Sequence, residues 1–450
     1  MTAGVRVGDF VVDARPPALA RARAAAAVLD TAGVTLAGAS EPASRIVQQV
    51  VANEGGGACR VLGTRGRASA AGAALANGTA AHALDYDDMC FVSLAHPSAP
   101  LMPALLAAGE LAGSTGSDVL DAYIVGFEIE ARLGGLMNPR HYQRGWHCTS
   151  TIGTIGAAAA VSRLLGLDRA AAGHALAIAA SEASGLKENF GTMVKPLHAG
   201  LAARNGVHAG LLAKGGMIAS ALALDGPQGF LHAMDGERIA IGDALADLGR
   251  RWEILDTGIT VKLYPSCAGT HPALDALLDL RRREGFEADD VQHIDIGVDS
   301  ITPTILIYER PASGLEGKFS MPFCAAAAVV FGRVGLETFD AATLSNAGVT
   351  ALMPRVTMRV DPSVDGTGPP LTQARVSVRL RDGRVLTAHA NGARGYPERP
   401  AADAELDAKF LECARRALPD ASCETALAML RQIGQVEDIR LLTAALSFAF

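Results

Sequence analysis

Apolar residues recur with helical spacing through the first half of the chain. The segments that show this pattern are rich in alanine and separated by short Gly, Pro or Asp breaks: 17–38, 68–84, 99–113, 117–135, 150–166, 169–184 and 199–215. No alternating, strand-like pattern comes before about residue 290. The first half is therefore predicted to be a bundle of helices.

The pattern changes near residue 265. Segments 271–284 and 321–335 still look helical, but the alternation typical of strands appears at 293–300, 357–363 and 374–391. The last strand pattern contains Arg-Asp-Gly-Arg, a hairpin turn signal. We predict a mainly α chain with an α+β part, in three stretches: a large helical domain (1–264), a smaller α/β domain (265–398) and C-terminal helices that return to the helical domain (399–450).

Composition narrows the class of protein. A chain of 450 residues is too long for one ordinary core, so two or three domains are expected. Aromatic residues make up only 5% of a chain that is 49% apolar, which suits closely packed helices with small residues at their contacts. The net charge is −7 and no basic block occurs, so we expect no nucleic-acid partner.

The sequence also bears on where the protein works. No run of 18 apolar residues is free of charges and breakers, and residues 1–17 lack the apolar core of a signal peptide. The seven cysteines are odd in number and form no C-x-x-C pair, so neither a disulfide framework nor a zinc ribbon is expected. We therefore expect a cytoplasmic protein with no membrane partner.

Lysine is rare among the basic residues. Only six of the 40 are lysine: Lys187, Lys195, Lys214, Lys262, Lys318 and Lys409. The pKa of an ammonium group can be tuned by its surroundings, whereas a guanidinium stays charged. Each of these lysines is thus present either by chance or because it has a catalytic or binding role.

Four short stretches combine polar side chains with glycine or proline in this alanine-rich chain. Their candidate residues are Asp85, Asp87, Asp88 and His96 in 82–100, His147 in 144–156, Lys195, His198 and Arg204 in 187–206, and Lys262, Tyr264, Cys267 and His271 in 261–276. A plainer interpretation stands beside each. Asp87 and Asp88 would simply cap or solvate a loop, and His82 and His174 would be packed residues inside helices.

Several kinds of site lack their sequence signal. No H-x-x-x-H or H-E-x-x-H spacing supports a metal, and no G-x-S-x-G supports a Ser-His-Asp hydrolase. Neither a G-x-G-x-x-G after a strand nor a Walker loop supports a nucleotide cofactor. We expect no metal and no cofactor. The remaining His, Lys and Asp residues suit removal of a proton next to a carboxylate, where a base acts and cations stabilise the enediolate.

The same stretches resemble the MmgE/PrpD family, which includes 2-methylcitrate dehydratase, cis-aconitate decarboxylase and iminodisuccinate epimerase. The likeness is carried by ordered blocks along most of the chain: VLDTAGVTLAG (28–38), NGTAAHALDYDD (77–88), HPSAPLMPALLAAGE (96–110), GWHCTSTIGTIGAAAA (145–160), KPLHAGLAARNG (195–206), KLYPSCAGTHP (262–272), KFSMPF (318–323), GYPERP (395–400) and LDAKF (406–410).

The resemblance implies a large all-helical domain with an α/β lid, a homodimer, and an active site between domain and lid. Matched block by block, the family's site residues fall on Asp85, His96, His147, Lys195 and Lys262. Three positions depart from cis-aconitate decarboxylase: Cys267 replaces a histidine, Phe323 a tyrosine and Met89 a threonine. These departures weaken the decarboxylase interpretation.

From the sequence we expect a hydro-lyase similar to 2-methylcitrate dehydratase, acting on a small di- or tricarboxylate. The resemblance implies that His96 and His147 form the acid/base pair, that Lys195 and Lys262 bind carboxylates, and that Asp85 orients a neighbour. The substrate-binding candidates are His198, Arg204, Tyr264 and His271. One alternative is an epimerase of a dicarboxylate, with Cys267 as one of two bases; a decarboxylase and a binding protein without activity are the others.

Overall fold

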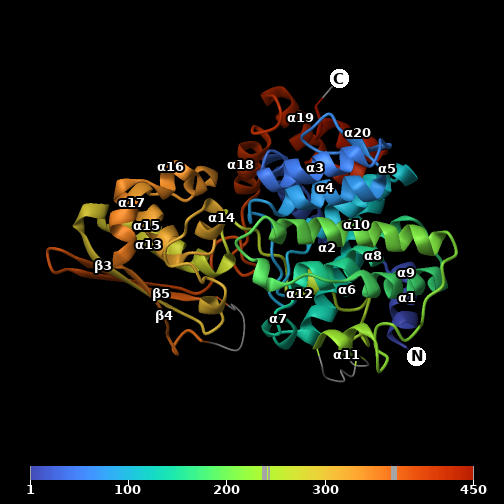
Figure 1. Ribbon diagram of the computed structural model, residues 1–450, viewed down its shortest axis with the longest axis horizontal. Coiled ribbons are helices and arrows are strands. Elements are labelled where there is room, and N and C mark those ends of the chain that lie inside the picture. Colours follow the sequence, from blue (N-terminus) through green and yellow to red (C-terminus); the bar gives the residue numbers. More distant parts are fainter. Residues whose placement is uncertain (1, 236–240, 242–243, 366–371, 449–450) are drawn as a thin grey trace. The chain divides into compact units, whose positions relative to one another are not determined.

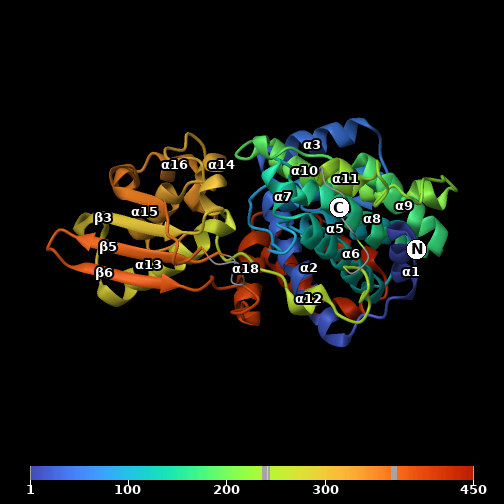
Figure 2. The same cartoon turned by 90° about the horizontal axis from the view of Figure 1, so that it is seen from below.

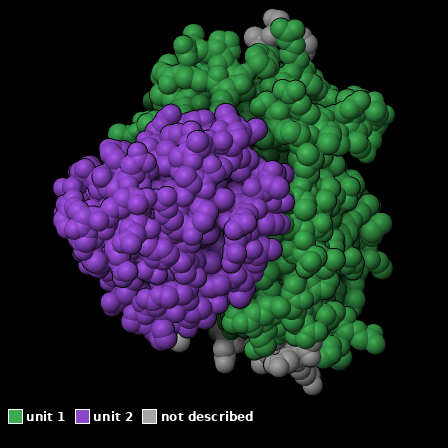
Figure 3. Space-filling model, turned by 60° about the vertical axis from the view of Figure 1, so that its left-hand side comes forward, with its two compact units in different colours: residues 1–260, 402–450 green, residues 261–401 purple. Residues whose placement is uncertain are grey.

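The computed structural model describes residues 2–235, 241, 244–365 and 372–448. The chain divides into two compact units, coloured separately in Figure 3. Unit 1 comprises residues 1–260 and 402–450, and unit 2 comprises residues 261–401. The sequence pattern predicted residues 264 and 398 as the ends of the first two stretches.

Unit 1 is helical (Figure 1). Its α-helices are α1 (Ala3–Asp13), α2 (Ala18–Gly38), α3 (Pro42–Asn53), α4 (Ala70–His82), α5 (Ser98–Ala112), α6 (Gly116–Met137), α7 (Arg140–Gln143), α8 (Cys148–Leu164), α9 (Arg169–Glu182), α10 (Val194–Lys214), α11 (Phe230–Asp235), α12 (Glu253–Asp256), α18 (Asp403–Ala414), α19 (Asp420–Arg431) and α20 (Ile439–Ala445). The predicted helical bundle is confirmed, although the sequence pattern did not predict α1 or α3.

Glycines let α10 pack closely against two other helices. A Cβ at Gly78 of α4 would lie 2.8 Å from Cα of Gly200 of α10, and a Cβ at Gly206 would lie 2.4 Å from Cβ of Ala157 of α8. A larger residue at either glycine would push the helices apart. The close packing brings the ends of α4, α8 and α10 together, and these ends carry the polar side chains described below.

Two expectations for unit 1 were wrong in detail. A short antiparallel pair, β1 (Cys59–Arg60) with β2 (Arg67–Ala68), lies in the half predicted to have no strands. Two residues per strand are too few to show an alternating pattern. Helix α10 begins at Val194, five residues before the predicted start at 199. Its first turn contains Pro196, which a helix tolerates there because the missing N–H has no partner within the helix.

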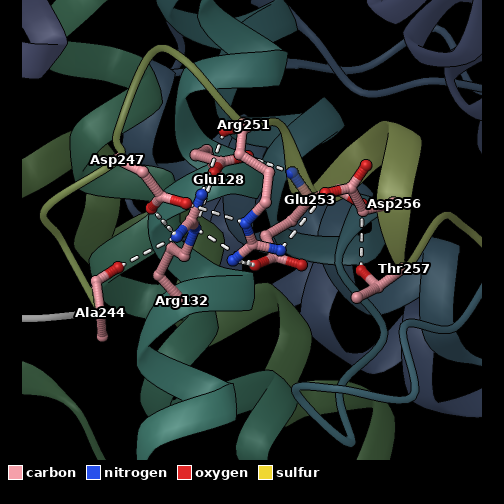
Figure 4. A network of polar contacts seen from close by, with 8 residues as sticks. All are labelled: Glu128, Arg132, Ala244, Asp247, Arg251, Glu253, Asp256 and Thr257. Atoms are coloured by element: carbon pink, nitrogen blue, oxygen red, sulfur yellow. Dashed lines mark hydrogen bonds and ion pairs between the residues drawn. The ribbon is translucent and has the colours of Figure 1, made fainter.

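A buried charge network ties α6 to the segment that follows residue 243 (Figure 4). Arg132, 4% exposed, donates to Oε1 of Glu128 at 2.8 Å, to Asp247 and to the carbonyl of Arg251 at 3.0 Å. The backbone N–H of Glu253 donates to the other oxygen of Glu128 at 2.7 Å. The buried guanidinium therefore has carboxylates and a carbonyl around it, as a buried charge requires.

Unit 2 is an α/β fold, as predicted. Its helices are α13 (His271–Glu284), α14 (Gly314–Gly317), α15 (Met321–Phe331), α16 (Ala341–Leu344) and α17 (Ala347–Leu352), and its strands are β3 (Val291–Val298), β4 (Val356–Val360), β5 (Ala374–Leu380) and β6 (Val385–Ala390). The strand order is β4-β3-β5-β6. Within this unit, α13 and α15 cover the same face of the sheet (Figures 1 and 2).

The sheet of unit 2 is mixed. β3 pairs in parallel with β4, with Ile294 beside Val356, and antiparallel with β5, with Ile294 beside Val378. β5 and β6 form the predicted hairpin around Gly383, whose φ of +92° suits a glycine. A parallel pair needs a long crossover, and α14 to α17 supply it. Among the described residues of the whole chain, no helix combines the length and the hydropathy that a membrane span needs.

Candidate active site

The loop between α4 and α5 carries buried polar side chains into the interior of unit 1. Asp85 is 4% exposed, and its φ of +51° places it in the left-handed region. Such a backbone costs a residue other than glycine about 1–3 kcal/mol and persists only where the surroundings hold it. Aspartate tolerates this conformation better than most residues. The turn sets the directions in which the aspartates of the loop project.

Asp87 lies between two histidines. Its Oδ2 is 2.7 Å from Nδ1 of His82 and 3.1 Å from Nδ1 of His96. Asp87 is completely buried, and the rings of the two histidines meet edge to face at 4.5 Å. The sequence left Asp87 either as a candidate for chemistry or as a residue that caps or solvates a loop, and its burial between two histidines rules out the solvated loop residue. His82 is packed inside the fold, as predicted, but it is also part of this polar cluster.

Lys195, in the first turn of α10, joins the cluster from the opposite side. Its Nζ donates to Oδ1 of Asp85 at 2.5 Å and lies 2.8 Å from Nε2 of His82. Lys195 is 4% exposed. An ammonium group can only donate, so Nε2 of His82 accepts and Nδ1 carries the proton that is donated to Asp87. One continuous set of contacts thus runs from Asp85 through Lys195 and His82 to Asp87.

His147 and His198 lie beside these groups. His147 immediately precedes α8, and its backbone N–H donates to the carbonyl of Gly185 at 3.0 Å. Its Nδ1 is 3.0 Å from Nδ1 of His198, and its ring stacks against that of His82 with a centroid separation of 5.7 Å. Phe190 meets the His147 ring edge to face at 4.9 Å. The backbone and three neighbouring rings therefore hold this imidazole in place.

Burial keeps these imidazoles neutral. It lowers the pKa of His82 to about 3 and that of His198 to about 4. Burial, followed by the charge of Lys195, holds the pKa of His147 well below its usual range. Burial alone would raise the pKa of Asp87, but His82 and His96 outweigh it and hold that pKa well below normal. At neutral pH the cluster therefore contains unprotonated imidazoles that can accept a proton.

Asp88 points away from this group. It accepts from the N–H of Ser98 at 3.2 Å and from its hydroxyl at 2.5 Å, at the start of α5. Of the two plainer interpretations, these contacts fit the cap, and complete burial rules out the solvated loop residue. Burial raises the pKa of Asp88 to about 8, so this carboxyl keeps its proton at neutral pH.

His82, Asp87 and His96 could in principle share a metal ion, because one ligand atom from each lies within 4.8 Å of the others. Two of these separations, 2.7 and 3.1 Å, are hydrogen-bonding distances. The ligands of a tetrahedral zinc lie about 3.3 Å apart, because each bond is about 2.0–2.1 Å long. The His82–Asp87 contact therefore fits a hydrogen bond, and a zinc ion bound there would require these two side chains to move apart.

Four of the predicted residues lie in unit 2. Lys262 is completely buried, and the N–H of its neighbour Val261 donates to the carbonyl of Gly395 at 2.9 Å. Tyr264 donates to Asp275 at 2.5 Å, and Nε2 of His271 lies 3.1 Å from the carbonyl of Ser266. Tyr264 and His271 thus have partners within the loop and helix that carry them.

Cys267 is partly exposed in the same loop. Its N–H donates to the carbonyl of Lys318 at 3.0 Å, while the ammonium of Lys318 donates to the carbonyl of Pro265 at 2.8 Å. The block around Lys318 therefore fixes the backbone next to Cys267. Phe323 packs against Phe339 with ring centroids 5.8 Å apart.

The structure brings most of the unit 1 candidates together. Asp85, His96, His147, Lys195 and His198 lie in one buried group, whereas Arg204 lies farther along α10 and donates to Oδ1 of Asn205 at 3.0 and 3.1 Å. The sequence pattern identified His82 only as a packed residue, and it named Asp87 as a candidate without a role in this group. One signal was available: His82 is a polar residue at the end of an alanine-rich helix, directly before the aspartate-rich loop.

Comparisons with known proteins agree with this organisation. Residues 6–240 match the MmgE/PrpD N-terminal domain, and residues 264–435 match the MmgE/PrpD C-terminal domain. The chain is 28% identical to the cis-aconitate decarboxylase-like protein oryM of Aspergillus oryzae, covering 90% of this chain and 89% of that protein. It is 26% identical to human cis-aconitate decarboxylase, covering 83% of this chain and 79% of the human protein.

A third relative is the cis-aconitate decarboxylase of Aspergillus terreus, at 29% identity over 84% of this chain and 81% of the fungal protein. Since both family domains match in order and together span most of the sequence, this protein belongs to the MmgE/PrpD family.

Proposed function

We propose that this protein is a cofactor-independent lyase that dehydrates a small di- or tricarboxylate. The observation that carries the proposal is the buried ammonium of Lys195, held by Asp85 and His82 close to the neutral imidazole of His147. Such a site offers a base and a fixed cation together. Removal of a proton next to a carboxylate needs both.

Lys195 is proposed to stabilise the negative charge that forms on the substrate during the reaction. When the proton leaves the carbon next to a carboxylate, negative charge moves onto the carboxylate oxygens. A preorganised ammonium stabilises that charge more in the transition state than in the ground state, which is the condition for catalysis. Asp85 and His82 hold the ammonium in place beforehand. Lys262, also buried, is proposed to bind a second carboxylate.

His147 and His96 are proposed to transfer the two protons of the reaction. His147 takes the proton from carbon, and the electrons of that C–H bond form the new C=C bond. The C–O bond on the neighbouring carbon breaks, and the hydroxyl leaves as water with a proton from His96. Asp87, 3.1 Å from Nδ1 of His96, orients that ring for the transfer. His198 supports His147 through their contact at 3.0 Å.

The relatives support decarboxylation as a second candidate, because several are named cis-aconitate decarboxylase. Cys267 and Phe323 count against it, since an imidazole and a phenol stand at these positions in the decarboxylase. Epimerisation is the remaining alternative. It requires bases on opposite faces of one carbon, and Cys267 is proposed as one of them.

One experiment separates the reactions. The purified protein is incubated in deuterium oxide with citrate, 2-methylcitrate, cis-aconitate and iminodisuccinate, one at a time. A new alkene absorbance with release of water supports the proposal. Release of carbon dioxide from cis-aconitate identifies a decarboxylase, and deuterium incorporation without an alkene identifies an epimerase. If none of the four substrates changes, the proposed function is wrong.

A further inference from the structure

The C-terminal segment places a lysine beneath the aspartate loop of the active site. Lys409 of α18 is 3% exposed, and its Nζ donates to the backbone carbonyl of Tyr86 at 2.8 Å. The same Nζ lies 2.7 Å from Oδ1 of Asp30 on α2, and 4.0 Å from the centre of the Tyr86 ring. Helix α18 packs against α2, so both partners of this ion pair belong to the core of unit 1.

The hydrogen bond from Lys409 reaches the backbone between two aspartates of the cluster, because of where Tyr86 stands in the loop. Tyr86 lies between Asp85, which binds Lys195, and Asp87, which binds His82. The carbonyl held by Lys409 is therefore the backbone group that separates the two carboxylates of the cluster. The backbone at Asp85 is left-handed, with φ of +51°, so the loop depends on its surroundings to keep this conformation.

The charges around Lys409 also connect it to the aspartate loop. Burial raises the pKa of Asp30, and the charge of Lys409 opposes that rise. Asp87 acts on Asp30 as a further negative charge. Asp30 also contributes to the raised pKa of Asp88, after burial. The ammonium thus neutralises a carboxylate that would otherwise repel the acidic loop.

We infer that Lys409 is a positioning residue for the active site, which fixes the Asp85–Asp87 turn through the Tyr86 carbonyl while Asp30 balances its charge. This inference rests on the proposed function of the His82–Lys195 cluster. A plainer alternative is that the Asp30–Lys409 pair only joins α2 to α18. The two explanations differ in what they predict for a variant that lacks the ion pair but still folds. A positioning role predicts slower catalysis, and a purely structural role predicts unchanged catalysis.

The test replaces the pair by apolar residues of similar size, Asp30→Leu with Lys409→Met, because removing one partner alone would leave a buried charge. The matched control is Glu128→Gln with Arg132→Met, which removes another buried ion pair of unit 1 (Figure 4). The turnover number of the Asp30/Lys409 variant should fall at least about 100-fold with a KM within about threefold of wild type, as misplaced catalytic groups lose rate. The control should stay within about threefold in both.

A second variant asks whether the hydrogen bond to Tyr86 is what matters. Asp30→Asn with Lys409→Gln removes both charges but keeps an N–H donor at position 409. It should recover at least about tenfold of the turnover lost in the apolar variant. A turnover of the apolar variant within about threefold of wild type would overturn the inference, and so would equal losses in the two variants. If the apolar variant does not fold, Asp30→Asn with Lys409→Met takes its place under the same criteria.

A measurement without substrate separates this inference from the proposed function. Side-chain ¹⁵N spectra of labelled histidine report the tautomer of His82 and the environment of His96, with assignment by His82→Gln and His96→Gln. Both signals should shift in the apolar Asp30/Lys409 variant and stay unchanged in the Glu128/Arg132 control. If the wild type turns over no substrate, the proposed function fails and these spectra still test the position of the loop. Unshifted signals in the apolar variant would refute the role of Lys409.

Discussion

The imidazole of His82 and the ammonium of Lys195 determine each other's hydrogen positions. The 2.8 Å contact between Nζ and Nε2 requires the ring nitrogen to accept, so the proton of His82 lies on Nδ1, 2.7 Å from Asp87. Both nitrogens of His82 are therefore occupied. His82 is thus suited to orient its neighbours, and the proposed function assigns proton transfer to His147 and His96.

We predict that Lys195→Ala lowers kcat/KM far more than Lys214→Ala does. Lys195 is buried among Asp85 and two histidines, whereas Lys214 is exposed at the end of the same helix. Loss of one contact that stabilises charge in a transition state costs about 10²–10³ in rate. Steady-state kinetics of the two variants on the accepted substrate measure the difference. Similar kcat/KM values for both would remove Lys195 from the active site.

The buried histidines predict how stability depends on pH. The pKa of His82 is about 3 in the folded protein, against about 6.5 for an unperturbed histidine. Between these values the unfolded chain binds more protons, so the free energy of unfolding falls as pH drops below about 6.5. The contribution of one such group is about 1.4 kcal/mol per pH unit. Above about pH 6.5 the ring is neutral in both states, so His82 causes no loss of stability there.

Urea unfolding at pH 7 and pH 5 checks this expectation in His82→Gln, with His293→Gln, a partly exposed histidine of unit 2, as control. His82→Gln should reduce the loss of stability between the two pH values, and His293→Gln should not. Asp88 acts in the opposite direction, because its raised pKa of about 8 favours the folded state at low pH. Its contribution is common to all the proteins and cancels in the comparison. An equal pH dependence in wild type and His82→Gln would show that His82 is not buried as a neutral ring.

Much of the fold could be predicted from the sequence, because the periodic pattern is long in most elements. Helices α2 and α13 and the β5–β6 hairpin fall where that pattern placed them. The start of α10 was missed because the glycine, threonine and proline of residues 191–196 look like a loop. Proline breaks a helix in its interior but fits its first turn, and Pro196 occupies that turn.

The candidate site was predicted in parts and not as a whole. The polar blocks identified Asp85, His96, His147 and Lys195 one at a time, but contacts between blocks come from packing. His82 and Lys195 are separated by 113 positions in the chain, and they meet because α4 and α10 approach closely at Gly78 and Gly200. No pattern within one block contains that information.

We predict that activity does not depend on a metal ion. Oδ2 of Asp87 lies 2.7 Å from Nδ1 of His82, a hydrogen bond that is shorter than the spacing of about 3.3 Å between the ligands of a tetrahedral zinc ion. Dialysis against EDTA, followed by assay with and without added divalent ions, tests this. Activity should be unchanged after dialysis. Full loss in EDTA with recovery on adding one ion would show that the three side chains open to bind it.

Finally, we predict that decarboxylation of cis-aconitate by the wild type is absent or very slow. The family resemblance implies a histidine in cis-aconitate decarboxylase at the position of Cys267. A thiol has a reference pKa of about 8.5 against about 6.5 for imidazole, so it is the poorer acid by about 2 units. A thiol also has no cationic form, whereas an imidazolium offers its charge to a developing dianion. Phe323 removes a second acid, because a phenyl ring has no proton to donate.

The test supplies cis-aconitate and measures itaconate and carbon dioxide from wild type, Cys267→His and Cys267→Ser. Only Cys267→His restores a titratable acid of the right kind, so it alone should raise the rate of decarboxylation. Cys267→Ser controls for the loss of the thiol, which would itself become a base if a neighbouring cation lowered its pKa. Rapid itaconate production by the wild type would contradict this prediction. It would mean that Lys195 and the unit 1 histidines suffice for decarboxylation whatever residue occupies position 267.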